Sequence, residues 1–322
     1  MMRRPKRKFI MGEISVIITS WNARQYLRDC LLSIRKTAGE LIREVIVVDN
    51  ASTDGSPEMV EKEFPEVVLI RSSHNLGFAG ANNLGLRRAT GELVALINSD
   101  VIVDADCFQR LALCIKDHEE VGLVGPRLRG RDGQAQMTCR RLPTIWNTVW
   151  RMPSLDRALS RWPLFSPFQM WYWNTERRMT VEVLAGCFWL ARRRAVDQVG
   201  ALDERFFFYS EDVDWCKRFK DAGWKLRFVP DATAIHFGGA SAANAPLRYQ
   251  IEILRSNLAY WKKHYGNLGW LTFYLSVTAQ HGLRFVARWF LKNTGLNRKQ
   301  ETGRKLQEHL VCLRWLLTGR SA

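Results

Sequence analysis

The chain has 322 residues, 47% of them hydrophobic, so it is long enough for one α/β domain with appendages and can bury a sizeable core. A net charge of +16 suggests nucleic acid as a partner, but residues 1–8 supply +5 and residues 281–322 supply +7, which leaves only +4 for everything between. The seven cysteines are scattered without a C-x-x-C pair, which argues against a zinc ribbon or a disulfide scaffold and fits a reducing cytosol.

The N-terminus is expected to be a basic tail, residues 1–12. The apolar run that follows, 9–19, is short, carries Glu13 and leads into a polar turn without a small-residue cleavage site. A signal peptide is therefore not expected, and we place the chain in the cytoplasm.

From the end of this tail onward, apolar runs typical of buried strands alternate with helical patterns. Strand-to-helix units at this spacing predict an α/β fold with a doubly wound, mostly parallel sheet and helices on both faces. We place this domain at residues 13–246. The runs and the polar residues that follow them are 14–19 with Ser20 and Asn22, 45–48 with Asp49, 67–70 with Arg71, and 93–97 with Asn98, Ser99 and Asp100.

Residues 131–180 break this pattern and hold five of the 13 Trp among Pro and Arg. The segment is expected to be either a hydrophobic lid or acceptor groove, or an extra packed subdomain. Regularity returns with a strand at 186–191, a helix that ends at Asp221, and a strand at 226–229 that precedes His236.

Residues 247–322 have a helical, amphipathic and basic pattern. Basic clusters beside Trp-containing apolar segments fit a peripheral position on an anionic membrane surface, at about 1 kcal/mol per basic residue; solvated helix faces are the alternative. The segment 264–282 lacks formal charge but contains Asn267, Gln280 and two His, so we expect it to lie in the interface rather than to cross the bilayer.

Three carboxylates follow strands in the first half of the chain. Asp100 suits a hard divalent ion that also holds two phosphates, although an acid there can equally cap the next helix. Asp49, with Asn50, could accept hydrogen bonds from a base or ribose. Asp54, followed by Gly55, is more simply explained as a turn with a helix cap.

The second half of the chain offers an acid pair and a histidine. Glu211 and Asp212 open a helix, where a fixed carboxylate could deprotonate a sugar hydroxyl, but acids are also favoured there by the helix dipole. His236 could ligate a metal, although a lone histidine is more often a satisfied core residue.

Four segments carry a more specific pattern, and in this order they closely resemble glycosyltransferase family 2, especially its rhamnosyltransferase-like and galactofuranosyltransferase-like branch. The resemblance covers about residues 13–265. No G-x-G-x-x-G follows the first strand, which counts against a dinucleotide dehydrogenase. The segments are 47–56 (VVDNASTDGS), 75–85 (NLGFAGANNLG), 98–100 (NSD) and 209–215 (YSEDVDW).

The resemblance implies a GT-A fold, a nucleotide-diphosphate sugar as donor, Mg²⁺ or Mn²⁺ as cofactor, and transfer with inversion of the anomeric centre. It implies that Asp49 contacts the base, that Asp100 and His236 ligate the metal, and that Asp212 is the general base with Glu211 as its neighbour. The remaining residues assigned to the nucleotide pocket are Ser20, Asn22, Asn50, Arg71, Asn75, Gly77, Asn83, Asn98 and Ser99.

One departure concerns the metal site. Many relatives have Asp-x-Asp where this chain has Asn98-Ser99-Asp100, so one carboxylate remains there. The branch makes dTDP-rhamnose the first candidate donor and a UDP-sugar the second, with a lipid-linked or polysaccharide acceptor in bacterial cell-surface glycan synthesis.

Two other functions are weighed against this one. A catalytically silent or partner-dependent subunit of a polysaccharide assembly complex would be expected to lose at least one of Asp100, Asp212 and His236, and all are present. A nucleic-acid binder is suggested by net charge alone, and the concentration of that charge at the two ends of the chain argues against it.

Overall fold

The computed structural model describes residues 12–37, 39–145, 176–238, 246–293 and 300–319. The expected basic tail, apart from residue 12, and the five Trp of the 131–180 segment lie outside these ranges. The chain divides into two compact units. We call Met1–Arg140, Asn174–Glu204 and Asp212–Ser241 the sheet unit, and Arg141–Trp173, Arg205–Glu211 and Ala242–Ala322 the helical unit.

The sheet unit is built on a nine-stranded sheet with the order β3-β2-β1-β4-β10-β6-β11-β5, and β8 pairs with β11. Strands β3, β2, β1 and β4 are parallel, as are β6 and β11. Strand β10 runs antiparallel between β4 and β6, and β5 and β8 run antiparallel to β11. The sheet is therefore mostly parallel, as the sequence predicts. The strands are β1 (Ile14–Ser20), β2 (Ile42–Asp49), β3 (Val68–Arg71), β4 (Leu93–Asn98), β5 (Val101–Val103), β6 (Val121–Arg129), β8 (Met179–Val181), β10 (Phe188–Arg192) and β11 (Lys225–His236).

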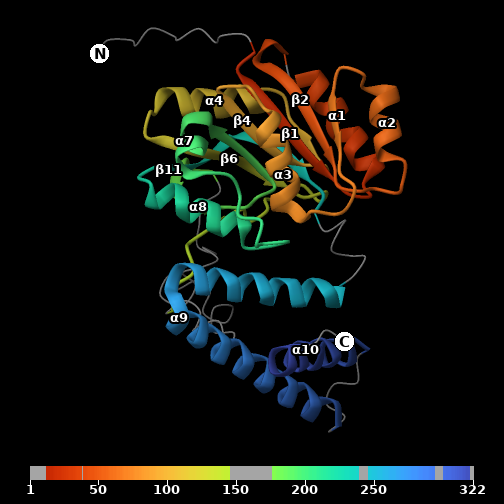
Figure 1. Cartoon of the computed structure of the whole chain (residues 1–322), viewed down its shortest axis with the longest axis vertical. Coiled ribbons are helices and arrows are strands. Elements are labelled where there is room, and N and C mark those ends of the chain that lie inside the picture. The colour runs from red at the N-terminus through yellow and green to blue at the C-terminus, as the bar shows by residue number, and fades with distance from the viewer. Residues whose placement is uncertain (1–11, 38, 146–175, 239–245, 294–299, 320–322) are drawn as a thin grey trace. The chain divides into compact units, whose positions relative to one another are not determined.

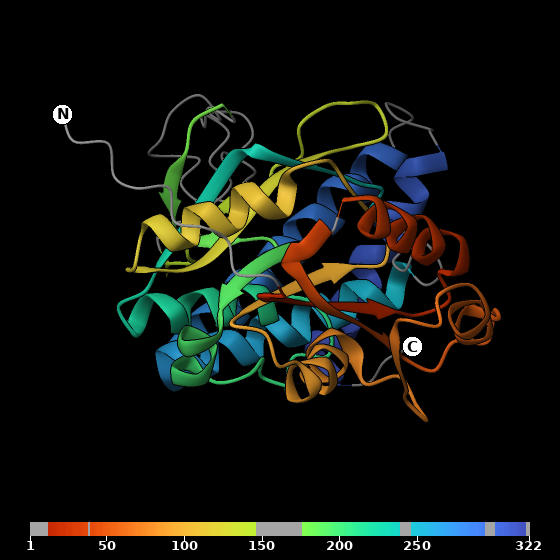
Figure 2. The same ribbon diagram turned by 90° about the horizontal axis from the view of Figure 1, so that it is seen from above.

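Helices cover both faces of this sheet, and Figures 1 and 2 place α3 and α4 on opposite sides of it. A separate two-stranded sheet pairs β7 (Cys139–Arg140) with β9 (Val183–Leu184). The helices are α1 (Arg24–Thr37), the short 3-10 turn η1 (Gly39–Leu41), α2 (Ser56–Glu63), α3 (Gly77–Arg88), α4 (Cys107–Asp117), α7 (Arg193–Val199) and α8 (Glu211–Asp221).

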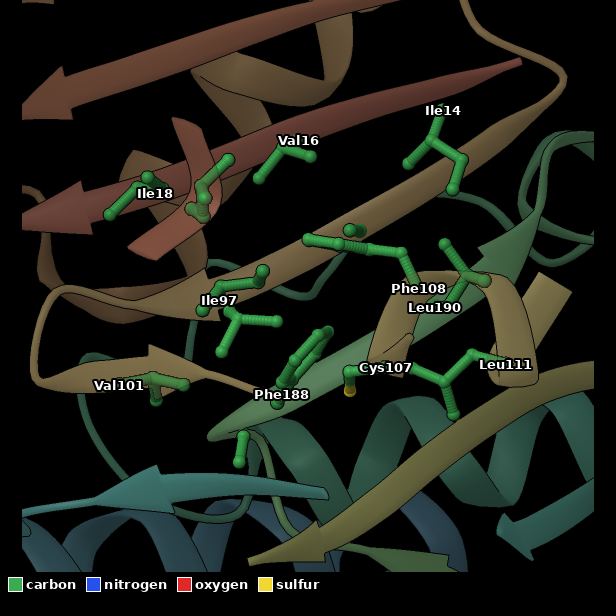
Figure 3. Packing of buried hydrophobic residues seen from close by; sticks show 14 of the residues in the cluster. Ile14, Val16, Ile18, Ile97, Val101, Cys107, Phe108, Leu111, Phe188 and Leu190 are labelled. Atoms are coloured by element: carbon green, nitrogen blue, oxygen red, sulfur yellow. The ribbon is translucent and has the colours of Figure 1, made fainter. Parts of the chain in front are cut away.

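The alternation of side chains along β1 explains the two covered faces. Ile14, Val16 and Ile18 belong to the main core cluster, together with Phe108 and Leu111 of α4 (Figure 3). Ile17 points to the other face, where α3 packs so closely that a Cβ at Gly85 would lie 2.3 Å from an Ile17 methyl carbon. A glycine is therefore required there for α3 to approach the sheet.

The helical unit contains α9 (Pro246–Asn293), which is kinked at Gly266, and α10 (Gln300–Thr318). The kink arises because Gly266 has a φ of 67°, a conformation outside the helical region that glycine adopts without strain. Within the described ranges, no helix is both long and apolar enough to cross a membrane. The two helices share a small core of Leu254, Leu258, Val277, Cys312 and Leu316, with Trp270, Phe273, Tyr274 and Trp315 packed against it.

Candidate active site

The polar residues that follow the parallel strands meet at one edge of the sheet. Ser20 at the end of β1 pairs in register with Asp49 at the end of β2, and Asp49 pairs with Arg71 at the end of β3. On the other side of β1, Asn98 of β4 pairs with Thr19. Ligands of open α/β sheets bind at this carboxyl edge, so the sheet brings these predicted residues together where a ligand would bind.

Two asparagines shape the loops above that edge. The Asn50 side chain accepts a hydrogen bond from Leu76 N (2.8 Å) and donates to Asn75 Oδ1 (2.9 Å) and to the Gly77 carbonyl (3.2 Å). Asn22 accepts from Thr53 N at 2.7 Å, so it joins the loop after β1 to the loop after β2. These contacts hold the backbone that would line a nucleotide pocket.

Two acceptor atoms at this edge are buried without a hydrogen-bond partner in the described part of the chain. They are Ser20 Oγ and Asp49 Oδ1, which belong to paired residues of neighbouring strands. The other oxygen of Asp49 accepts from Ser52 N at 3.0 Å, so the carboxylate is held in place. Buried polar atoms are rarely left unpaired, and a ligand that donates hydrogen bonds would satisfy these two.

The other residues predicted for the pocket have structural contacts. Asn83 donates to the Leu202 carbonyl (2.9 Å) and to Glu204 (2.8 Å), and its oxygen accepts from Leu202 N (3.0 Å). Arg71 is exposed and pairs with Glu58 and Glu61 of α2.

Nearer the strand ends, Asn98 N donates to the Cys187 carbonyl (3.0 Å), and the Ser99 side chain is buried. Asp54 accepts from Arg24 N (2.8 Å) and Ser56 N (3.0 Å) at the starts of α1 and α2, which agrees with the predicted turn-and-cap role.

Asp100 and His236 lie next to each other at the ends of β4 and β11. The His236 Nε2 atom is 3.4 Å from Asp100 Oδ1, while Asp100 Oδ2 accepts from Gly238 N at 3.0 Å. Burial lowers the His236 pKa, but hydrogen bonds with Asp100 and Cys187 and their charges outweigh it, so the pKa is raised to about 10. The raised pKa means that the neighbouring Asp100 carboxylate stabilises the protonated form of the His236 ring.

The pair also fits a divalent cation. Two ligands bound about 2.1 Å from one ion and about 90–110° apart lie roughly 3.0–3.4 Å from each other, and the separation of Nε2 from Oδ1 is in that range. No group of three or more His, Cys, Asp and Glu side chains gathers as a metal cluster in the ranges that the structure describes. A cation here would therefore need further ligands from phosphate oxygens or water.

Asp212 opens α8 and is buried in an ion pair with Arg140 of β7. Its other oxygen accepts from Val213 N at 2.8 Å, and Glu211 beside it is also buried. Burial lowers the Arg140 pKa, but the Asp212 carboxylate and neighbouring thiols raise it more, so Arg140 stays charged. The carboxylate is thus fixed from two sides.

The start of β10 connects this carboxylate with the Asp100–His236 pair. A Cβ built at Gly186 would lie 3.5 Å from Asp212 Cβ, and the next residue, Cys187, is near enough to His236 to raise its pKa. Asp212 and the Asp100–His236 pair therefore both lie next to the start of β10, at residues 186 and 187.

Comparison with known proteins identifies the family. The profile described as Glycosyl transferase family 2 matches residues 15–200, more than half of the chain. The chain belongs to glycosyltransferase family 2.

Relatives of this family 2 glycosyltransferase include an N-acetylglucosaminyl-diphospho-decaprenol L-rhamnosyltransferase of Mycobacterium tuberculosis, which is 28% identical over 72% of this chain and 78% of its own length. The low-salt glycan biosynthesis hexosyltransferase Agl10 of Haloferax volcanii is 22% identical over 75% of this chain and 73% of its own.

Solved structures support the fold of the enzyme. The mannosyltransferase PcManGT from Pyrobaculum calidifontis, in complex with GDP-Man and Mn²⁺, superposes with a TM-score of 0.59 over 97% of this chain and 89% of its own, at 15% identity. GalNAc-T7 with UDP, GalNAc and Mn²⁺ gives a TM-score of 0.55 over 78% of this chain and 51% of its own, also at 15% identity. The predicted GT-A fold is confirmed.

Three residues that contact the candidate catalytic and metal-binding groups of this glycosyltransferase are not predicted by its sequence. They are Arg140, which pairs with Asp212, Gln136, which hydrogen-bonds His236, and Cys187, which raises the pKa of His236. The run at 186–191 predicts only a strand, and neither Arg140 nor Gln136 belongs to a periodic pattern. Nothing local in the sequence marks them.

Proposed function

We propose that this family 2 glycosyltransferase moves a sugar from a nucleotide diphosphate to an acceptor hydroxyl with inversion of the anomeric centre. The observation that carries the proposal is the gathering of three kinds of group in the sheet unit. The unpaired acceptors Ser20 and Asp49 suit a nucleobase, the Asp100–His236 pair suits a diphosphate-bound cation, and Asp212 suits an acceptor hydroxyl.

The buried acceptor atoms support a donor whose base carries an imide N–H. Thymine and uracil present such a group, and Asp49 Oδ1 would accept a charge-assisted hydrogen bond from it. The Mycobacterium tuberculosis relative is named as an L-rhamnosyltransferase. We therefore take dTDP-rhamnose as the first donor to test and a UDP-sugar as the second.

Asp100 Oδ1 and His236 Nε2 would hold Mg²⁺ or Mn²⁺ together with oxygens of the donor diphosphate. When bound, such an ion supplies positive charge that stabilises the leaving nucleoside diphosphate. One carboxylate in place of Asp-x-Asp leaves His236 as the second protein ligand.

Asp212 carries out the proton transfer in this proposal. Its carboxylate takes the proton of the acceptor hydroxyl as that oxygen attacks the anomeric carbon from the face opposite the diphosphate. The bond from the anomeric carbon to the diphosphate oxygen breaks with its electron pair remaining on the diphosphate. One displacement inverts the anomeric centre, and the proton ends on Asp212.

The helical unit supports a lipid-linked acceptor and a peripheral position on an anionic membrane. Large apolar side chains project from one face of α9 at helical spacing and are exposed: Leu268, Leu271, Leu275, Leu283, Val286 and Phe290. Arg284, Arg288 and Lys292 lie on the same stretch of helix, and the sequence has no Asp or Glu from residue 253 to 300. Such a face suits an interface that is apolar below and negatively charged at its surface. The Mycobacterium tuberculosis relative is named for a diphospho-decaprenol acceptor.

Release of nucleoside diphosphate tests the proposal. The full chain is incubated with dTDP-, UDP- and GDP-sugars, with and without Mn²⁺ and with a polyprenyl-diphosphate-linked N-acetylglucosamine, and is compared with Asp100→Ala. We expect metal-dependent release from one donor and its loss in the variant. Nucleotide binding without release from any donor would favour the silent or partner-dependent subunit, and absence of binding would overturn the proposal.

A further inference from the structure

Gln136 lies behind His236, on the side away from Asp100. It is held there by its backbone, because Gln136 N donates to the Leu128 carbonyl (2.8 Å) at the base of a short hairpin after β6. We propose that Gln136 is a positioning residue that fixes the ring of His236 in the tautomer with a bare Nε2 directed at the cation. This inference rests on the proposed metal role of His236.

Hydrogen-bond chemistry fixes which way the Gln136 amide points. Gln136 Nε2 lies 2.8 Å from the His236 carbonyl oxygen, which can only accept, so the amide NH₂ group is on that side. Gln136 Oε1 is then the atom that lies 2.8 Å from His236 Nδ1. Because Oε1 can only accept, Nδ1 must carry the hydrogen.

The hydrogen on Nδ1 determines what the other side of the ring can do. A histidine that ligates a cation through one ring nitrogen is neutral, so with its hydrogen on Nδ1 the lone pair available to the cation is on Nε2, the atom that faces Asp100. Asp100 is oriented in the same way, since its Oδ2 accepts from Gly238 N and leaves Oδ1 facing Nε2 at 3.4 Å. The Gly238 amide and Gln136 thus orient Asp100 Oδ1 and His236 Nε2 toward each other, as two ligands of one cation would be.

Partners of this kind orient ligands in metal sites, and their removal typically lowers metal affinity about 10- to 100-fold. Among the residues that the structure describes, His236 Nδ1 is the group that Gln136 Oε1 contacts, so loss of Gln136 should act on the metal through His236. Replacement by Leu removes the acceptor, whereas replacement by Glu keeps an acceptor oxygen for Nδ1–H.

The experiment measures Mn²⁺ binding in the presence of UDP, by electron paramagnetic resonance, for the full-length chain and its variants. We expect Gln136→Leu to weaken Mn²⁺ binding about 10- to 100-fold, and Gln136→Glu, which keeps the acceptor for Nδ1–H but loses the donor to the His236 carbonyl, to bind Mn²⁺ more tightly than Gln136→Leu. The matched control is Gln134→Leu, an exposed glutamine of the same hairpin, which should not change the affinity. Unchanged Mn²⁺ affinity in Gln136→Leu would overturn the inference.

A second measurement needs no change at Gln136. In ¹⁵N-histidine-labelled wild type loaded with UDP and the diamagnetic Zn²⁺, His236 should show a protonated Nδ1 and an unprotonated Nε2, with its signals assigned through His236→Asn. A protonated Nε2 would contradict the proposal. His236→Asn distinguishes failure of this inference from failure of the proposed metal role. Unchanged Mn²⁺ affinity in His236→Asn would refute the metal role of His236. Weakened Mn²⁺ affinity in His236→Asn together with normal affinity in Gln136→Leu would refute only the role of Gln136.

Discussion

The sheet unit and the helical unit place their apolar side chains in opposite ways. Among the described residues, Leu113 is the only large apolar side chain of the sheet unit that is exposed, while Trp189 and Trp215 are fully buried there. In the helical unit Leu283 is 66% exposed and Trp289 is 53% exposed. Contiguous exposed apolar surface usually marks an interaction site, so the two units are built for different tasks.

Ionisable side chains, in contrast, are buried mainly in the sheet unit. The sheet unit buries Asp49, Asp100, Asp212 and His236, which burial disfavours unless each group has a partner or a function. The described part of the helical unit buries few such groups, and its basic residues lie beside the apolar face. We infer that chemistry belongs to the sheet unit and attachment to the helical unit, and the following changes test that division.

Asp212→Asn should have the largest effect. The amide cannot take a proton, so we expect kcat to fall by about 10²- to 10⁴-fold while vesicle binding is unchanged. Steady-state transfer to a soluble acceptor analogue measures it. The control is Asp221→Asn, at the exposed end of the same helix, where the carboxylate pairs with Lys217. Near-wild-type transfer by Asp212→Asn would remove Asp212 from the mechanism.

Introducing charge into the apolar face of α9 should separate attachment from chemistry. We expect the triple variant Leu283→Glu, Val286→Glu and Phe290→Glu to lower binding to vesicles that contain anionic lipid by about 10²-fold, because exposed apolar area no longer enters the interface. Flotation with vesicles measures this. Transfer to a soluble acceptor should be unchanged.

The control for the triple variant adds the same charge at exposed glutamines elsewhere: Gln109→Glu, Gln198→Glu and Gln307→Glu. It should bind vesicles far better than the triple variant. Equal binding by both would show that net charge, not the apolar face, decides attachment.

Arg140→Met should have a smaller effect on catalysis than loss of Asp212. The guanidinium holds the Asp212 carboxylate, and without it the carboxylate is free to leave the position needed for proton transfer. We expect kcat to fall about 10- to 50-fold with the donor KM unchanged, and Arg140→Lys to recover part of the rate. A rise in donor KM without a fall in kcat would show that Arg140 binds the donor instead.

The sequence predicted the parts of the site that depend on local patterns. The apolar runs locate the ends of β1 to β4, and parallel pairing then aligns Ser20, Asp49 and Asn98 without further information. Asp54 followed by Gly55 is a local signal as well. The antiparallel insertion of β10 between β4 and β6 was not predicted, because pairing between distant strands leaves no periodic trace in either strand.

The sequence also does not predict which residues the individual polar side chains of the site contact. The motif at 75–85 suggests a pocket role for Asn83, yet its amide contacts residues about 120 positions away, Leu202 and Glu204. Arg140 and Gln136 lie in a two-residue strand and a hairpin, where neither spacing nor propensity marks their partners. Such partners are fixed by tertiary packing, so only the structure brings them together.

The smallest predicted effect concerns the stability of the helical unit at acid pH. His281 of α9 and His309 of α10 lie with their Nδ1 atoms 3.1 Å apart, so one ring donates to the other only while at least one is neutral. Burial, the neighbouring histidine and Arg284 lower the His281 pKa to about 4, and burial with Arg288 and Arg284 lowers the His309 pKa to about 4. An unfolded chain binds these protons near pH 6.5, so the stabilisation is complete above that pH and is lost as pH falls from 6.5 toward 4.

Calorimetric unfolding of the full chain between pH 7 and pH 4.5 measures this loss. We expect the transition of the helical unit to lose stability in that window, and the double variant His281→Gln, His309→Gln to lose less. The exposed His74, replaced by Gln, is the control and should leave the pH dependence as in the wild type. If the double variant kept the full pH dependence, the acid sensitivity would come from other groups. A reduced dependence would mean that the contact between α9 and α10, and with it the apolar face that α9 presents, is held together by a neutral histidine pair.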